Sequence, residues 1–151
     1  MEEINIRCMK YKDIEKAMEI NKRFLPTRYP YIVWLYLYLM HRGHNFVAIH
    51  ANTIIGYILA DCNEILSLVV HKNYRRKGIG KMLLFHALNT YDKTLCLHVR
   101  TSNKIAIKLY KSCGFKLQNI KKSFYANNSE DAYVMKRFIK TKYDVQSEIN
   151  I

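Results

Sequence analysis

The sequence predicts one α/β domain, layered in the α+β manner, in which helices flank a mixed and mostly antiparallel central sheet. Two observations lead to this fold class. The chain has 151 residues, half of them hydrophobic, which is enough for one buried core but not for two. Runs with strand-like and helical periodicity then alternate along it. We expect the domain to span residues 1–140, followed by a loose tail at residues 141–151, where apolar residues are few.

Each element follows from local patterning. Strands are expected where apolar residues alternate or run together between turn residues, at residues 5–9, 46–49, 54–59, 65–70, 95–99, 115–123 and 132–135. Helices are expected over about residues 12–23 (capped by Asp13), over residues 31–41 and 79–88, and from Ser102 or Asn103 to Gly114. The two prolines within residues 25–30 exclude regular helix there. The aromatic helix that follows should be core, although its tyrosines could instead line a groove beside the prolines.

Composition narrows the function classes. The net charge of +13 fits a polyanionic partner such as ribosomal RNA, an acidic peptide or the phosphates of a cofactor, and equally fits a lysine-rich solvated surface. There is no zinc-finger spacing and no basic-region heptad, so sequence-specific nucleic-acid binding is not expected. The four cysteines form no Cys-x-x-Cys pair, which predicts reduced thiols without a metal. With no signal peptide and no bilayer-length apolar run, we expect a cytoplasmic protein without a membrane partner.

The stretch after residue 70 is the strongest functional signal. The apolar strand at residues 65–70 runs into a basic turn with two glycines, Gly78 and Gly80, and then into a helix. The first turn of a helix has free N–H groups and partial positive charge, and glycines allow a phosphate to approach the backbone. The turn fits neither the Walker pattern nor the dinucleotide fingerprint. An anion site is expected here, the alternative being a basic loop with a helix-starting glycine.

Two further residues could carry acid–base chemistry. Period two places His98 on the face of its strand opposite the apolar residues Leu95, Leu97 and Val99. A histidine ordinarily titrates near pH 6.5 and could take a proton from an α-amine, unless a neighbour simply satisfies it structurally. Tyr110 lies on the same helical face as Asn103, and a phenol can protonate a departing thiolate, unless it is a core tyrosine. Cys96 and Cys113 lack a basic partner in sequence, so a covalent thioester intermediate is not expected.

Together these motifs resemble a known family. The order Arg75-x-x-Gly78-x-Gly80 resembles the acyl-CoA pyrophosphate loop of the GNAT N-acetyltransferases. The similarity spans about residues 4–136 and points to the GNAT subgroup that acetylates protein N-termini, which includes bacterial RimI, archaeal enzymes and the NatA catalytic subunit. Within this subgroup the chain most resembles the NatA catalytic subunits and their archaeal relatives. The segments that carry it are Leu25-Pro26-x-x-Tyr29, Leu97-His98-Val99-Arg100-x-Ser102-Asn103, Ala106-x-x-Leu109-Tyr110, Tyr125 and Glu130-Asp131-Ala132-Tyr133-x-Met135.

The resemblance implies acetyl transfer from acetyl-CoA to a protein α-amine in a ternary complex, without a metal. It implies His98 as base, Tyr110 as acid and Glu64 as a second candidate base. Acetyl-CoA contacts are implied for Leu68, Val70, Arg75, Arg76, Lys77, Gly78, Ile79, Gly80, Asn103 and Tyr110. Substrate-peptide contacts are implied for Leu25, Pro26, Thr27, Tyr29 and Tyr125. Peptide N-termini are the implied partners, with an auxiliary subunit and the ribosome left open.

One difference between this sequence and the family pattern affects the expected choice of substrate. NatA catalytic subunits have Pro-Glu-Asn-Tyr where this chain has Pro26-Thr27-Arg28-Tyr29. Loss of the glutamate and gain of Arg28 predict an altered choice of N-terminus, toward a Met-initiated or acidic second-residue substrate. The alternatives are RimI-like acetylation of ribosomal proteins, acetylation of a small-molecule amine on the same fold, and a non-catalytic acetyl-CoA-binding subunit of a ribosome-associated complex. Leu25, Pro26 and Tyr125 argue against the small-molecule case, because they would shape a peptide groove.

Overall fold

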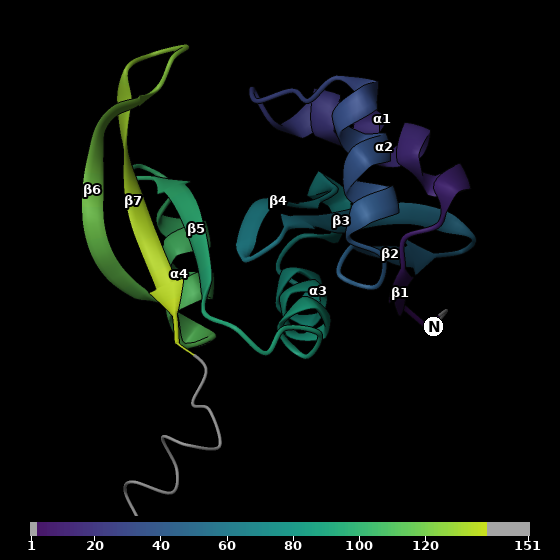
Figure 1. Cartoon of the computed structure of the whole chain (residues 1–151). Coiled ribbons are helices and arrows are strands. Elements are labelled where there is room, and N and C mark those ends of the chain that lie inside the picture. The colour runs from purple at the N-terminus through teal and green to yellow at the C-terminus, as the bar shows by residue number, and fades with distance from the viewer. Residues whose placement is uncertain (1–2, 139–151) are drawn as a thin grey trace, which may run out of the picture.

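The computed structural model describes residues 3–138, so the expected domain end at residue 140 and the tail at residues 141–151 lie outside the described residues. Seven strands form one sheet in the order β1-β2-β3-β4-β5-β7-β6 (Figure 1). They are β1 (Asn5–Cys8), β2 (Phe46–His50), β3 (Thr53–Asp61), β4 (Glu64–Val70), β5 (Leu95–Arg100), β6 (Lys116–Tyr125) and β7 (Glu130–Arg137). Every neighbouring pair is antiparallel except β4 with β5, which confirms the mixed and mostly antiparallel sheet.

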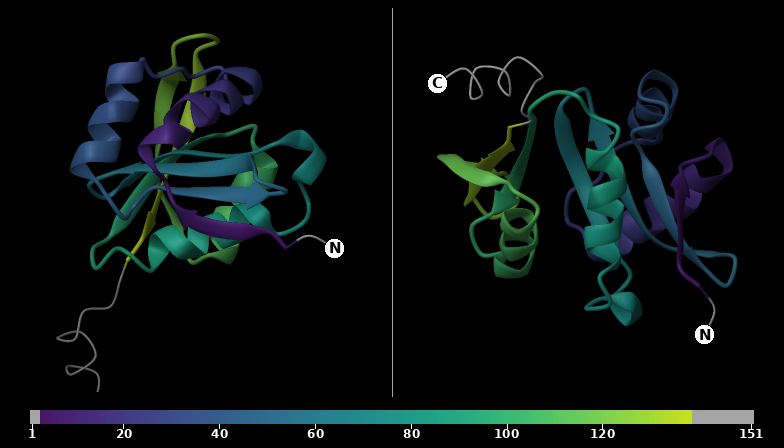
Figure 2. Two further views of the ribbon diagram at one scale, coloured as in Figure 1. Left: turned by 90° about the vertical axis from the view of Figure 1, so that its right-hand side faces the viewer. Right: turned by 90° about the horizontal axis from the view of Figure 1, so that it is seen from below.

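Helices cover both faces of this sheet (Figure 2). They are α1 (Ile14–Phe24), α2 (Tyr31–Met40), α3 (Ile79–Leu88) and α4 (Lys104–Ser112), with short 3-10 turns at Tyr11–Asp13 and Lys72–Tyr74. Along β3, Tyr57 and Leu59 pack with α1 and α2, whereas Ile58 packs with α3 on the opposite face. This alternation follows from the period of two along a strand. Within residues 3–138, no helix has both the length and the apolar content that crossing a membrane requires.

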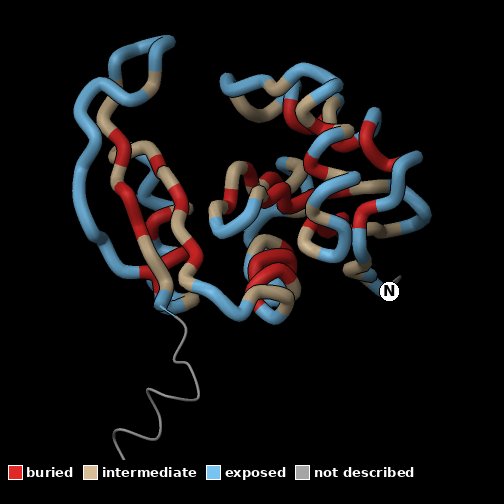
Figure 3. Tube along the Cα trace, in the orientation of Figure 1, coloured by how far each residue is buried: buried red, intermediate tan, exposed pale blue. Residues whose placement is uncertain are grey.

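Two expected features of the first helices differ in the structure. Asp13 makes no capping hydrogen bond to α1. Its carboxylate instead accepts from the Arg7 guanidinium (2.6 and 3.0 Å) and from the Lys10 N–H (2.7 Å), because a charged donor is the stronger partner. The core prediction for α2 holds for one face only. Trp34 and Leu37 are buried, and the exposed side chains are Tyr31, Ile32, Tyr36, Leu39 and Met40 (Figure 3).

The turns and caps of the second half follow the local sequence. Asn103 caps α4, since its side-chain oxygen accepts from the Ala106 N–H at 3.1 Å. Gly114 ends this helix with φ +87°, a conformation that favours glycine. Gly56 on β3 is required for a different reason. A Cβ at this position would lie 2.7 Å from the carbonyl oxygen of Val69 on β4.

The sheet is split near its middle. The parallel pairing of β4 with β5 consists of Glu64 opposite Cys96 and Ile65 opposite Leu97. Beyond these two positions the strands diverge, as Figure 1 shows, while β4 stays paired with β3 as far as Val70. Within residues 3–138, the edge of β4 that faces β5 therefore has main-chain groups without a strand partner from Leu66 onward.

Candidate active site

The structure has a cavity of about 540 Å³ at the place where β4 and β5 diverge. It is lined by the loop between α1 and α2, by β4 and β5, by the start of α4 and by the end of β6. Many residues that the sequence analysis singled out line it together: Leu25, Pro26, Thr27, Tyr29, Glu64, Leu68, His98, Asn103, Tyr110 and Tyr125. In Figure 1 the loop and the tip of the β6–β7 hairpin face each other across this region.

His98 and Glu64, the two candidate bases, form one hydrogen-bonded pair. Nδ1 of His98 lies 2.7 Å from Oε1 of Glu64. The parallel register makes this possible, because it places Glu64 opposite Cys96, which is two residues from His98 and on the same face of β5. The imidazole is 15% exposed and the Glu64 side chain 35%, so the carboxylate is the more open of the two. The Nε2 atom of His98 is buried without a hydrogen-bond partner among the described residues. A contact at Nδ1 fixes the ring and leaves Nε2 free for proton transfer.

Phe124 completes the surroundings of His98, and the sequence analysis missed it. Its ring stacks on the imidazole, with centroids 4.6 Å apart and planes 4° from parallel. Adjacent residues of a regular strand face opposite sides, yet Phe124 and Tyr125 both line the cavity. The register of β6 with β7 shifts between Lys121 and Tyr125, and Ser123 has φ +48°. This bulge turns both rings toward the cavity, and no pattern in the local sequence predicts the bulge.

Tyr110 is a buried phenol at the cavity wall. Its side chain is 8% exposed and packs edge-on against Phe115. Burial, with smaller effects from Tyr125 and Cys113, raises the pKa of Tyr110 well above its usual value. Across the cavity, burial and the nearby Glu64 carboxylate raise the pKa of Tyr29. Both phenols therefore stay protonated at neutral pH and can donate a hydrogen bond.

A network of polar side chains holds Tyr125 in position. The Arg100 guanidinium lies 3.8 Å from the centroid of the Tyr125 ring and donates to Glu130 at 3.0 Å. Glu130 also accepts from the Ser102 hydroxyl and N–H. The Ser102 hydroxyl and N–H, followed by Arg100, lower the pKa of Glu130 to about 2. Arg100, Ser102 and Glu130 belong to the segments that carry the family resemblance, but no local sequence pattern predicts the network that they form.

The expected anion loop lies outside the residues that line the cavity. Gly78 has φ +78° and precedes α3, whose first helical hydrogen bond runs from the Met82 N–H to the Gly78 carbonyl. The N–H groups of Ile79 and Gly80 thus have no acceptor within the helix, as an anion site requires. One side chain of the same loop contacts the end of β4. Arg75 Nε donates to the Val70 carbonyl at 2.9 Å, so this carbonyl, implied to contact acetyl-CoA, is engaged by the chain itself.

Comparison with known proteins identifies the family. The profile of the Acetyltransferase (GNAT) family matches residues 11–115, which is more than half of the chain. The chain belongs to the GNAT acetyltransferase family. This GNAT acetyltransferase is 33% identical to the N-alpha-acetyltransferase of Saccharolobus solfataricus, over 89% of the chain and 93% of that protein.

Two further likenesses bear on this GNAT acetyltransferase. It is 32% identical to a Dictyostelium discoideum protein named N-terminal acetyltransferase complex ARD1 subunit homolog, over 96% of the chain and 78% of that protein. Its fold matches Arabidopsis thaliana Naa50, solved in complex with the bisubstrate analogue CoA-Ac-MVNAL, at 25% identity and a TM-score of 0.81. That match covers 90% of this chain and 99% of the other. The resemblance drawn from the motifs is therefore confirmed at the level of the family and of its N-terminal acetyltransferase relatives.

Proposed function

We propose that this GNAT acetyltransferase transfers the acetyl group of acetyl-CoA to the N-terminal α-amine of a protein. The observation that carries the proposal is the cavity itself. It places the Glu64–His98 pair and Tyr110 between the Leu25–Tyr29 loop on one side and Tyr125 on the other. The relatives' name, N-alpha-acetyltransferase, supports the same activity.

Acetyl-CoA would bind in the gap where β4 and β5 diverge. The loop of Arg75, Arg76 and Lys77, together with the N–H groups that begin α3, would hold the pyrophosphate. The unpaired edge of β4 around Leu68 would hydrogen-bond the pantetheine arm in place of a neighbouring strand. Because Asn103 uses its side-chain oxygen to cap α4, its amide N–H₂ is the group left for the cosubstrate. The Arabidopsis neighbour was solved with a CoA-peptide conjugate, which supports a shared cavity for both substrates.

The reaction would proceed by direct attack. The Glu64–His98 pair accepts the proton of the α-amine, through Nε2 or a water next to the carboxylate, and the amine nitrogen forms a bond to the thioester carbon. The main-chain N–H groups of β4 stabilise the oxyanion. The carbon–sulfur bond then breaks, and Tyr110 gives its proton to the sulfur. The raised pKa of Tyr110 keeps the phenol protonated until the thiolate forms.

The choice of N-terminus would depend on the loop between α1 and α2. Thr27 lines the cavity, whereas Arg28 is exposed and lies outside its lining. A neutral threonine in place of the glutamate of NatA catalytic subunits removes a charge from the pocket for the first residue. Arg28 would act at the rim, where it could attract an acidic second residue. We therefore propose Met-initiated or acidic second-residue termini as substrates.

A partner subunit and the ribosome remain part of the proposal. The Dictyostelium relative is named as a homologue of a complex subunit. On this chain, α2 exposes the apolar side chains Tyr31, Ile32, Tyr36, Leu39 and Met40. An exposed apolar patch of this kind is typical of a protein interface. Cytoplasmic ribosomes, from which N-termini emerge, would suit the +13 net charge.

The test is release of free CoA from acetyl-CoA with short peptides that begin with Ser, Ala or Met, each also in an N-terminally blocked form. Turnover of free but not blocked peptides is expected, with Met-initiated or acidic second-residue peptides preferred. Thr27→Glu is the matched variant and should move the preference toward Ser and Ala. Acetyl-CoA binding without turnover of any peptide would favour the non-catalytic alternative. A Ser and Ala preference in the unmodified chain would overturn the proposed specificity.

A further inference from the structure

A cluster of metal-ligating side chains lies where α2 ends beside the β3–β4 turn. It consists of His41, which follows the last residue of α2, Asp61, which ends β3, and Cys62, the first residue of the turn. One ligating atom from each, an imidazole nitrogen, a carboxylate oxygen and a thiol sulfur, lies within 4.8 Å of the other two. None of the three residues lines the cavity described above. The proposed acetyl transfer gives this cluster no role.

Polar atoms in this cluster are buried without hydrogen bonds. Nε2 of His41 and Oδ1 of Asp61 lie 2.7 Å apart, as in a His–carboxylate ion pair, yet neither atom has a hydrogen-bond partner among the described residues. The Tyr91 hydroxyl is also buried without a partner. Burial, together with the neighbouring Asp61 and Cys62, raises its pKa to about 12. Unsatisfied buried polar atoms are rare enough to need a cause.

We propose that His41, Asp61 and Cys62 bind a zinc ion, with a water molecule in the fourth position. Sulfur, imidazole and carboxylate ligands in one site suit borderline Zn²⁺, whereas Ca²⁺ and Mg²⁺ prefer oxygen alone. Tetrahedral zinc with ordinary bond lengths places its nitrogen and oxygen ligands about 3.3 Å apart. The 2.7 Å separation of Nε2 and Oδ1 therefore has to open by only about 0.6 Å, within reach of the Asp61 side chain, which is 38% exposed.

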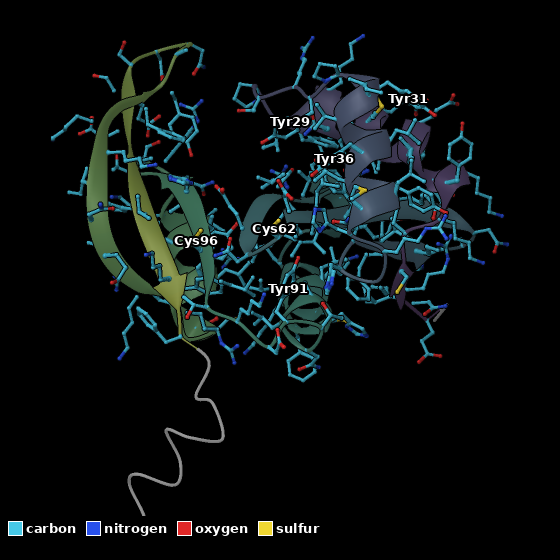
Figure 4. The ribbon with its side chains drawn as sticks, viewed as in Figure 1. Tyr29, Tyr31, Tyr36, Cys62, Tyr91 and Cys96 are labelled. Atoms are coloured by element: carbon cyan, nitrogen blue, oxygen red, sulfur yellow. The ribbon has the colours of Figure 1, made fainter. Side chains whose placement is uncertain are left out.

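The ion would act as a structural clip. It would tie the C-terminal end of α2 to the β3–β4 turn, two residues before Glu64 begins β4. Figure 4 labels Cys62 and Tyr91, which lie close together in that view, in agreement with the effect of Cys62 on the pKa of Tyr91. A thiol must lose its proton to become a zinc ligand, so zinc would bind more weakly in acid.

The sequence predicts no metal site, because its cysteines form no Cys-x-x-Cys pair. These ligands come instead from two segments about twenty residues apart, His41 and Asp61-Cys62. Only the fold brings them together, as α2 packs against β3.

The test uses cobalt(II) as a spectroscopic probe on the full chain, stripped of metal by a chelator and kept reduced. Binding of one equivalent should produce a thiolate-to-cobalt charge-transfer band and the visible bands of tetrahedral cobalt, and zinc(II) should abolish both by competition. Cys62→Ser should lose the charge-transfer band. Because Cys62 is exposed, this variant should fold normally. Cys8→Ser, which changes an equally exposed thiol on β1, is the matched control and should keep the band.

A second readout is the melting temperature. Zinc(II) should raise the Tm of the unmodified chain and of Cys8→Ser, and should raise that of Cys62→Ser much less, because a ligand stabilises only the state that binds it. No charge-transfer band at saturating cobalt(II) would overturn the proposal. So would a band that persists in Cys62→Ser or disappears in Cys8→Ser, since another thiol would then be the ligand. Neither readout depends on acetyl transfer, so its failure would leave the proposed function standing.

Discussion

Replacing His98 with alanine should lower kcat by about 10²- to 10⁴-fold, the range in which a positioned general base acts. Glu64→Gln should cost less. Glutamine keeps a side-chain oxygen to accept from Nδ1 but removes the charge from a contact of 2.7 Å. Hydrogen bonds to charged groups contribute about 1.5–3 kcal/mol. The neutral hydrogen bond that glutamine keeps contributes about 0.5–1.5 kcal/mol, so the loss is about 1–1.5 kcal/mol. At about 1.4 kcal/mol for each factor of ten, this corresponds to a kcat roughly 5- to 12-fold lower.

The double variant tests whether Glu64 lowers the barrier through His98 or independently of it. If Glu64 acts through His98, then Glu64→Gln should add little in the His98→Ala background, because the positioned group is already gone. The assay is initial-rate release of CoA at saturating acetyl-CoA and peptide, with cofactor binding measured separately. Cys96→Ser is the matched control on the same face of β5 and should change kcat less than about twofold, since Cys96 does not line the cavity. Two losses that multiply in the double variant, or a greater loss for Glu64→Gln than for His98→Ala, would refute this arrangement and make Glu64 an independent base.

Three further predictions follow from single contacts. Tyr110→Phe should lower kcat about 10²-fold, with acetyl-CoA affinity nearly unchanged, and an unaltered kcat would remove Tyr110 from proton transfer. The pKa of Glu130 is about 2 in the folded chain, against an ordinary value of 4.5. Between pH 4.5 and pH 2 the carboxyl is therefore protonated in the unfolded chain but still ionised in the folded one, so the folded chain should lose stability as the pH falls through this range. In urea titrations across that range Glu130→Gln should flatten this dependence, and an equally steep loss in the variant would contradict the assignment. Gly56→Ala should lower the free energy of unfolding by about 1–3 kcal/mol, because its Cβ would meet the Val69 carbonyl at 2.7 Å, and an unchanged denaturation midpoint would show that β3 and β4 can separate.

Most of the fold could be predicted because its signals are local. The α3 helix begins and ends where its apolar run does, at Ile79 and Leu88, and Asn103 caps α4 as an asparagine in that position should. Asp13 shows the limit of such reasoning. It stands at the expected capping position, but Arg7 from β1 takes its carboxylate. A partner that approaches from another element has no signature in the residues around Asp13.

The same distinction applies to the site. Period two placed His98 on the face of β5 that turned out to line the cavity. Its hydrogen bond to Glu64 depends on the register of β4 against β5, which is a long-range property. The contribution of Phe124 depends on a bulge in β6. The proposed zinc ligands depend on how α2 packs, so paired-cysteine spacing could not reveal them.

The divergence of β4 and β5 has a consequence for how the sequence can change over time. If acetyl-CoA pairs with the main chain of β4 beyond Ile65, then this part of the binding surface is made of atoms that every residue other than proline possesses. Substitutions at Leu66, Ser67 or Leu68 would therefore be limited by packing and strand propensity rather than by recognition of the cosubstrate. Within those limits, relatives could differ in sequence along this strand and still hold the same ligand.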